Sequence, residues 1–342
     1  MAAMTTRERF RAAMNFQPVD RLPAVEWAPW WDKTVNRWYD EGLPRELADN
    51  AIREYLGLDL HHWIWIGPPC ALTHPERSHA EGFLESIDEY DGLAAPLHDP
   101  VQIDRQALGR VAEDQRRGTH FVWFQIDGFF WFPRKVFGIE RHLYAFYDHP
   151  DLMHRINQDL CDYNIRLLDE LCKIVTPDAC SIAEDMSYNH GPMLSKAMFD
   201  EFLAPYYRRL VPALKKHGII ATVDSDGLVN PMIPWLEEVG VEGCDPLERQ
   251  AGVDVAQIRR DHPRWRMVGG FDKTVMHLGE AAMRREFERL LPVMRSGGLI
   301  PSVDHQTPPD VSLENYRIYI KLLHEYCEKG APRKSPRRES QE

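Results

Sequence analysis

Gly218-Ile-Ile-Ala-Thr-Val-Asp-Ser-Asp-Gly227 is a strand-like run that ends in two acids, and together with residues 228–248 it decides the fold. The apolar, β-branched segment 219–223 predicts a buried strand that stops at Asp224 and Asp226. Apolar residues at helical spacing follow over 230–239, and 241–245 predicts another strand. A strand, a helix and a strand within about thirty residues form a βαβ unit, which implies parallel strands.

The same alternation recurs along most of the chain. The expected strands are 24–27, 61–66, 121–126, 179–185, 219–223, 241–245, 265–272 and 298–305. Eight strands alternating with helices predict an α/β fold, a single (β/α)8 TIM barrel over residues 1–330 with an N-terminal helical extension. We further expect a hairpin insertion over 74–98, two outer helices over 140–174 that break at Pro150, and a charged, disordered tail over 331–342.

Composition limits the classes of function. The chain has 342 residues, 44% of them hydrophobic, and a formal charge of −12, which disfavours nucleic-acid binding. Its six cysteines form no CxxC pair, so we expect reduced thiols and no disulfide framework. No apolar run approaches membrane-spanning length and no hydrophobic signal core is visible, which predicts a cytoplasmic protein without membrane attachment.

Acidic residues stand at the ends of nearly all the expected strands. They are Glu26, Asp127, Glu184, Asp185, Asp224, Asp226, Asp245, Asp272 and Asp304, the last followed by His305. Barrel active sites lie at the carboxyl ends of the strands, so these groups are candidates for metal binding, for contacts to cationic groups or for proton transfer. For any one of them, a helix cap or a turn is an equally good explanation.

Several motifs carry a family resemblance. They are Thr6-Arg-Glu-Arg9 with Pro18-Val-Asp-Arg-Leu-Pro23, Glu184-Asp-Met186 with Gly191-Pro-Met-Leu-Ser195, Asp224-Ser-Asp-Gly227, and 298–309 with Ser312-Leu-Glu-Asn-Tyr316. On these motifs the chain resembles the uroporphyrinogen decarboxylase superfamily, in the branch that also holds cobalamin-dependent methyltransferases. The resemblance implies the same (β/α)8 barrel.

The departures from that family bear on mechanism. Its decarboxylases carry an N-terminal Arg-x-x-Gly-Arg motif that neutralises the substrate carboxylates, whereas residues 20–32 here offer only Arg21. A substrate with many carboxylates would meet an acidic mouth, which disfavours porphyrinogen decarboxylation. Thiol-directed methyltransferases of the family bind zinc through His-x-Cys and a later Cys. Those positions resemble Asp224-x-Asp226 and His305, a harder ligand set for zinc or a similar divalent metal, or a turn that binds substrate without metal.

The leading functional hypothesis is an enzyme that transfers a methyl group between a small methylated substrate and a corrinoid carried by a partner protein. His305, Asp226 and Glu184 are the expected catalytic residues. The expected substrate-binding residues are Glu26, Trp27, Asp127, Asp185, Tyr188, Asp245 and Asp272. Trp27, Trp31 and Trp131 are candidates for caging a methylated ammonium, although core packing accounts for each one as well.

Two alternatives stay open. One is a decarboxylase of uroporphyrinogen or a smaller acid, which would need no cofactor and for which His305 matches the histidine at the family's last strand end. The other is a barrel that binds a ligand without catalysis. A homodimer is a further expectation for any of the three.

Overall fold

The computed structural model describes residues 3–69, 81–84 and 86–333. The chain forms two compact units. Unit 1 consists of Met1–His61, Gly118–His120 and Pro246–Glu342, and unit 2 consists of His62–Arg117 and Phe121–Asp245.

Unit 2 is built on neighbouring strands in the order β1-β2-β3-β6-β7. β2 pairs in parallel with β3, β3 with β6, and β6 with β7. The strand bounds are β1 (Leu60–Trp65), β2 (His120–Asp127), β3 (Ala179–Ala183), β6 (Ile220–Asp224) and β7 (Gly243–Asp245), and a small antiparallel hairpin is made by β4 (Ser187–Tyr188) and β5 (Gly191–Pro192). The first residues of β1 and β2 fall in unit 1.

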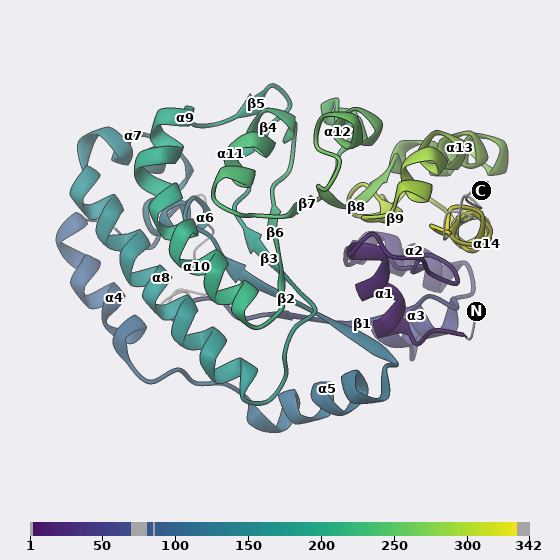
Figure 1. Cartoon of the computed structure of the whole chain (residues 1–342), viewed down its shortest axis with the longest axis horizontal. Coiled ribbons are helices and arrows are strands. Elements are labelled where there is room, and N and C mark those ends of the chain that lie inside the picture. Colours follow the sequence, from purple (N-terminus) through teal and green to yellow (C-terminus); the bar gives the residue numbers. More distant parts are fainter. Residues whose placement is uncertain (1–2, 70–80, 85, 334–342) are drawn as a thin grey trace, which may run out of the picture. The chain divides into compact units, whose positions relative to one another are not determined.

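Helices follow the strands of unit 2. They are α4 (Tyr90–His98), α5 (Arg105–Arg117), α6 (Trp131–Phe137), α7 (Ile139–Asp148), α8 (Pro150–Cys172), α9 (Lys196–Met198), α10 (Ala204–Lys216) and α11 (Ile233–Glu238), with short turns η2 (Ile87–Glu89), η3 (Phe199–Leu203) and η4 (Asn230–Met232). The long helices α8 and α10 pack side by side (Figure 1). Pro150 stands at the first position of α8, where its missing N–H costs no hydrogen bond.

Unit 1 combines the N-terminal helices with the last strands. Its elements are α1 (Thr6–Met14), α2 (Asp32–Asp40), α3 (Asn50–Tyr55), η5 (Arg249–Ala251), α12 (Val255–Asp261), β8 (Arg266–Phe271), η6 (Lys273–Leu278), α13 (Glu280–Ser296), β9 (Leu299–Val303) and α14 (Leu313–Lys329). A capping box between Thr5 and Glu8 fixes the start of α1. β8 and β9 pair in parallel, and α13 packs on α14.

The α/β class and the strand–helix alternation of a TIM-barrel-like fold are confirmed. Seven of the eight expected strands are present, but Ala24–Trp27 forms no backbone ladder among the described residues. The N–H of Asp59 donates to the Ala24 carbonyl at 2.8 Å, and the Trp27 N–H donates to the Ser302 hydroxyl at 3.4 Å. The segment is therefore held in an extended course by isolated contacts, and prolines on both sides of it remove ladder donors.

The expected hairpin insertion is wrong for the part that the structure describes. Residues 87–98 are helical, as η2 and α4, while residues 70–80 and 85, and the tail from 334 onward, lie outside the described residues. The two outer helices over 140–174 are confirmed as α7 and α8. The five described cysteines are free thiols. Among the described helices, none combines the length and the apolarity that crossing a membrane requires.

Candidate active site

Three acids of unit 2 stand in one row across the sheet. In the strand register, Asp127 on β2 aligns with Ala183, Ala183 aligns with Asp224 on β6, and Asp224 aligns with Asp245 on β7. Side chains at the same level of neighbouring strands point to the same face. The carboxyl ends of the strands thus present these acids on one face, as the sequence pattern predicts.

A layer of neutral polar side chains lies two residues below this row. The Gln125 amide donates to Asp224 Oδ2 at 2.9 Å, across the intervening strand β3. The hydroxyls of Ser181 and Thr222 donate to the buried Asp245 carboxyl at 3.1 and 3.2 Å. The donors that reach the two acids are therefore neutral, so they orient the carboxyl groups without cancelling their charge.

Asp224 is the most perturbed acid of the row. Burial, followed by repulsion from Asp245, Asp226 and Asp185, raises its pKa well above the ordinary value, and the hydrogen bond from Gln125 opposes this only in part. Burial also raises the pKa of Asp245, to about 7. Four strand-end carboxyls thus interact in unit 2, and burial and mutual repulsion raise the pKa of Asp224 above that of an ordinary carboxyl.

The loop after β3 brings Asp185 and Ser187 beside the turn after β6. Asp185 has a positive φ of 43°, an uncommon conformation for a residue other than glycine, and its carboxylate pairs with Arg134 at 2.9 Å. The Ser187 hydroxyl contacts the Ser225 hydroxyl and donates to the Asp226 carbonyl. Tyr188 on β4 is half exposed. The local geometry thus holds Asp185 and Asp226 on adjacent loops.

Glu184 has a clear structural role. Its buried carboxylate accepts hydrogen bonds from the N–H groups of Phe129, Phe130 and Trp131, at 2.8, 2.6 and 3.2 Å, and from the Tyr207 hydroxyl at 2.5 Å. These N–H groups lie at the start of α6, where backbone donors lack helical partners. Burial raises the pKa of Glu184 to about 7, against these four hydrogen bonds.

Gly128 is part of the same contact. A Cβ at this position would lie 2.2 Å from the Glu184 carboxyl carbon, so only glycine lets the carboxylate approach the helix start. Glu184 therefore anchors α6, and its expected catalytic role remains a prediction.

Asp127 is fully buried and already paired. Lys135 Nζ lies 2.6 Å from its Oδ2, and the Trp65 indole donates to its Oδ1 at 3.1 Å. Both carboxylate oxygens of Asp127 are thus engaged by Lys135 and Trp65, and the expected contact of Asp127 with substrate stays a prediction.

In unit 1, Glu26 is buried within a hydroxyl network. Ser302 donates to its Oε1 at 3.0 Å and Tyr316 to its Oε2 at 2.8 Å, while the Trp30 indole donates to the Tyr316 hydroxyl at 3.0 Å. Burial raises the pKa of Glu26 to about 7. Glu26, the acid predicted to end the first strand, thus faces β9 and α14 of its own unit.

His305 lies beside Trp27 at the end of β9. The two rings meet edge to face, with centroids 6.5 Å apart, and the Trp27 indole donates to the Val303 carbonyl at 2.9 Å. Burial and the nearby charge of Lys273 lower the pKa of His305, so its imidazole is neutral at pH 7. A neutral imidazole is a poorer proton donor than a protonated one. The catalytic role expected for His305 stays a prediction.

Asp304 and Asp272 are held as turn and cap residues of unit 1. Asp304 accepts the N–H groups of Arg249 and Lys273, at 3.0 and 3.2 Å, and burial raises its pKa to about 6. The Asp272 carboxylate accepts the Thr274 N–H at 2.9 Å at the start of η6. Both contacts match the turn and cap alternative, and the substrate contact expected for Asp272 stays a prediction.

Comparison with known proteins places the chain. A family profile described as Uroporphyrinogen decarboxylase (URO-D) matches residues 135–326. The chain belongs to this family.

A uroporphyrinogen decarboxylase of Pseudomonas savastanoi pv. phaseolicola is 28% identical over 193 residues, which are 52% of this chain and 50% of the relative. One of Hahella chejuensis is 26% identical over 188 residues, which are 52% and 49% of the two chains. The chain thus spans about half the length of the curated relatives that it matches.

A solved structure supports the fold over a longer span. A methyltransferase from Methanosarcina mazei superposes with a TM-score of 0.61 at 15% sequence identity, covering 94% of this chain and 99% of that one. At this identity the likeness establishes the α/β barrel-like fold of the family and nothing about the reaction.

The N-terminal arginines of this family member are engaged within unit 1. Arg21 forms a two-pronged ion pair with the buried carboxylate of Asp59, at 2.5 and 2.8 Å, and Arg9 pairs with Asp20 and Asp59. Both arginines are thus held by carboxylates of the same unit.

Sequence reasoning missed the partners of the acids. Gln125, Arg134, Lys135 and Lys273 contact or influence candidate residues but carry no motif of their own. The spacing of Gln125 two residues before Asp127 was the available signal, because alternate residues of a strand share a face. The two carboxylates of the predicted metal trio belong to unit 2 and His305 belongs to unit 1, so the trio stays a prediction.

Proposed function

We propose that this chain transfers a methyl group from a small methylated substrate to a corrinoid protein. The observation that carries the proposal is the environment of Asp224, whose carboxyl is oriented by neutral Gln125 and repelled by three neighbouring acids. Such a carboxyl keeps its proton to higher pH than an ordinary carboxyl and can deliver it to an oxygen or nitrogen that departs from a methyl group. Catalytic acids are commonly tuned in this way.

Gln125, Asp245 and Asp224 have distinct roles in this mechanism. Gln125 orients Asp224 through its amide, and Asp245, held by Ser181 and Thr222, maintains the repulsion that keeps the Asp224 proton in place. As the bond between methyl and oxygen breaks, the proton passes from Asp224 to the departing oxygen. A reduced corrinoid on a carrier protein would supply the electron pair that forms the new bond to the methyl group.

Unit 1 supplies a neutral imidazole. With its pKa lowered, the His305 imidazole is less readily protonated, and its ring meets that of Trp27 edge to face. We therefore assign the proton donor role to Asp224 and not to His305.

A decarboxylase is the second candidate, favoured by the names of the curated relatives. Two features speak against uroporphyrinogen itself. The acids of unit 2 would repel its carboxylates, and Arg21 is already bound to Asp59. The structural neighbour from Methanosarcina mazei is a methyltransferase, which agrees with methyl transfer.

A divalent metal at the Asp224 and Asp226 carboxylates of unit 2 is a separate proposal. Carboxylates suit a divalent ion, which would act as a Lewis acid on the departing atom. Asp226→Asn keeps the shape but removes one anionic ligand, so metal affinity should fall by tenfold or more, in order-of-magnitude terms. Elemental analysis of both proteins tests this, and a metal-free wild type would exclude the metal role.

The reaction is tested with free cob(I)alamin in place of the corrinoid protein. The purified chain is incubated with O-methyl and N-methyl compounds, and methylcobalamin is followed by its absorbance. Formation of methylcobalamin that depends on the chain and on a methylated compound supports the proposal. Conversion of uroporphyrinogen to coproporphyrinogen in a parallel assay would replace it with decarboxylation, and inactivity in both assays would favour the non-catalytic barrel.

A further inference from the structure

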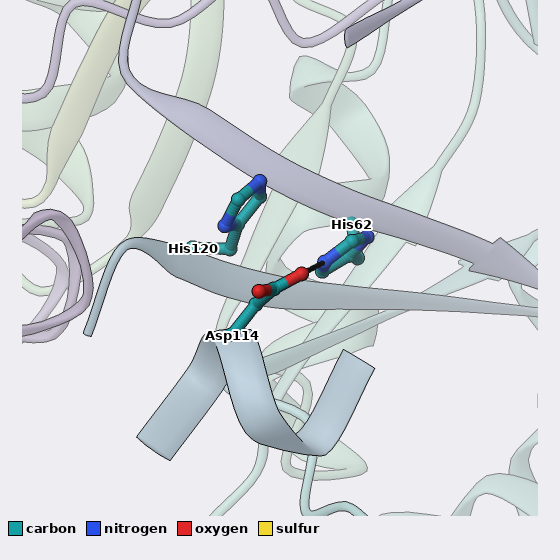
Figure 2. A group of neighbouring side chains, drawn as sticks. All are labelled: His62, Asp114 and His120. Carbon is teal, nitrogen blue, oxygen red and sulfur yellow. Dashed lines mark hydrogen bonds and ion pairs between the residues drawn. The ribbon is translucent and has the colours of Figure 1, made fainter. Parts of the chain in front are cut away.

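Two histidines and an aspartate meet near the amino end of β2. His62 lies on β1, His120 is the first residue of β2, and Asp114 lies near the end of α5, the helix that leads into β2. In a parallel sheet a helix returns the chain to the amino end of the next strand, so this connection brings Asp114 and His120 together. Figure 2 shows the three side chains beside one another.

The position of His120 follows from chain continuity with unit 2. Residues 118–120 are grouped with unit 1, but α5 before them and the rest of β2 after them both belong to unit 2. A link of three residues spans only about 10 Å, so His120 stays close to α5 and to β2. The Thr119 hydroxyl lies 2.9 Å from His120 Nδ1, a contact that orients the ring.

The polar atoms of the cluster are close enough to share one metal ion. His62 Nε2 lies 2.9 Å from Asp114 Oδ2, and one ligand atom of each of the three side chains lies within 4.8 Å of the others. Zinc holds imidazole nitrogens and carboxylate oxygens at about 2.0–2.2 Å, which places ligand atoms about 3–3.5 Å apart. A side-chain adjustment of about 1–1.5 Å therefore brings the cluster to the spacing of a zinc site.

The surroundings of the cluster suit a cation. The side chains of His62 and Asp114 are 22% and 33% exposed, so they are partly withdrawn from water while an ion can still reach them. Two basic residues follow Asp114 on α5, and both Arg116 and Arg117 pair with Glu113. This pairing compensates part of their charge and reduces the repulsion of a metal ion at Asp114.

The donor set favours a divalent transition metal. Imidazole nitrogens suit zinc and its neighbours in the first transition row, whereas magnesium and calcium prefer oxygen ligands. Three protein ligands with a further position for water is the arrangement of open zinc sites. Among the described residues, the cluster supplies these three ligands from three different elements, β1, α5 and β2.

The cluster lies at the opposite end of β2 from the acid row. β2 has eight residues, from His120 to Asp127, so at about 3.3 Å per residue its two ends lie about 23 Å apart. A metal ion at the cluster therefore does not contact Asp127 or the acids beside it. At the amino ends of barrel strands, side chains serve stability rather than catalysis.

We propose that His62, Asp114 and His120 bind one zinc ion that fastens β1 to α5 and β2. Binding replaces the hydrogen bond between His62 and Asp114 with two bonds to the ion, and the proton of that hydrogen bond leaves to solvent. The ion is separate from the metal proposed at Asp224 and Asp226, and it takes no part in methyl transfer.

Zinc titration of the chelator-treated full chain, followed by calorimetry, tests the binding. Asp114→Asn keeps the shape of the side chain but removes the anionic ligand, and His62→Gln removes an imidazole; circular dichroism checks that both fold. Each should weaken zinc binding by at least about tenfold, because even the loss of a hydrogen-bond partner of a ligand costs that much. Wild-type zinc affinity in both variants, or a wild-type chain that binds no zinc, would overturn the inference.

His217→Gln is the matched control for these variants. His217 also lies near a carboxylate, with its Nε2 3.9 Å from Asp169 Oδ1, but it stands outside the cluster. This variant should keep the zinc affinity of the wild type. An equal loss of affinity in His217→Gln and His62→Gln would overturn the inference, because it would show that zinc binds surface histidines without distinction.

Two further measurements separate this site from the carboxylates of the acid row. X-ray absorption of the wild-type chain with one equivalent of zinc should show two imidazole ligands, and zinc without imidazole ligands would overturn the inference. Because the three ligands meet only in the folded chain, zinc should raise the Tm of the wild type and of Asp226→Asn, and Asp114→Asn should lose this shift. A shift that is lost in Asp226→Asn but kept in Asp114→Asn would overturn the inference and support the metal at Asp224 and Asp226.

Discussion

The acids that the sequence predicts at strand ends have different surroundings in unit 1 and in unit 2. In unit 1, Glu26 accepts two hydroxyl donors and Asp304 accepts two backbone N–H groups. In unit 2, Asp224 receives one side-chain amide and is repelled by three other carboxyls. The partners of an acid therefore decide its properties, and the repulsion among carboxyls at Asp224 is the basis for proposing it as the proton donor.

The largest expected effect comes from the acid that the comparison singles out. Asp224→Asn keeps the size of the side chain but removes the transferable proton, so methyl transfer should fall by about 10²–10³-fold. Because the pKa of Asp224 is raised, wild-type activity should be present at low pH and decline as pH rises through that pKa. The measurement is a pH–rate profile of both proteins.

Asp200→Asn is the control for this change, since Asp200 is an exposed partner of Lys196 on the surface. It should leave both rate and pH profile unchanged. An Asp224→Asn variant with a wild-type rate would remove unit 2 from the mechanism.

The next effect tests whether the unit 1 charges serve the fold. Arg21→Ala leaves the buried Asp59 carboxylate without its two-pronged partner and should lower the free energy of unfolding by about 3 kcal/mol. Urea unfolding measures it, with Arg45→Ala as control, because the Arg45–Asp40 pair is exposed and should matter by less than about 1 kcal/mol. Unchanged stability in Arg21→Ala would free this arginine for a substrate role.

The sequence predicted the sheet better than the contacts of its acids. Strand periodicity and turn residues are local signals, so most strands and the long helix α8 were identified correctly. The strand prediction for 24–27 was wrong because isolated contacts with Asp59 and Ser302, and no strand pairing, hold this segment extended. No local sequence pattern reveals such contacts.

The candidate residues show the same limit. The position of Asp224 at a strand end follows from the pattern, whereas its repulsion by Asp245 depends on the register of β6 against β7. The anchoring of Glu184 by the start of α6 joins residues 53 to 55 positions apart in the chain. Burial and long-range pairing, which set the pKa values, emerge only from the folded structure.

A smaller effect is expected for the pH dependence of stability in unit 1. The pKa of Glu26 is raised from 4.5 to about 7, so its protonated form is favoured in the folded state. Its contribution is fully present below pH 4.5 and is lost as pH rises through 7. Glu26→Gln keeps a hydrogen-bonding group and cannot ionise, so the loss of stability between pH 5 and 7 should shrink by about 2 kcal/mol.

Thermal or urea unfolding at several pH values measures this difference. Glu46→Gln, a change of the same kind in the N-terminal part of unit 1, serves as the control. Identical pH dependence in wild type and Glu26→Gln would mean that the hydroxyl donors Ser302 and Tyr316 stabilise a charged Glu26.

The smallest effect concerns Gln125, whose side-chain amide donates to Asp224. Gln125→Met keeps the volume but removes the amide that donates to Asp224 Oδ2, so loss of one hydrogen bond should lower the rate about threefold to tenfold. That bond favours the charged carboxylate, so its removal raises the pKa of Asp224 and moves the high-pH decline of activity to higher pH. Gln115→Met is the matched control, because the Gln115 amide donates to Asp178 in the interior and its loss should lower stability without moving the pH profile. A Gln125→Met variant with a slower rate but an unmoved profile would show that Gln125 supports the sheet without tuning the acid.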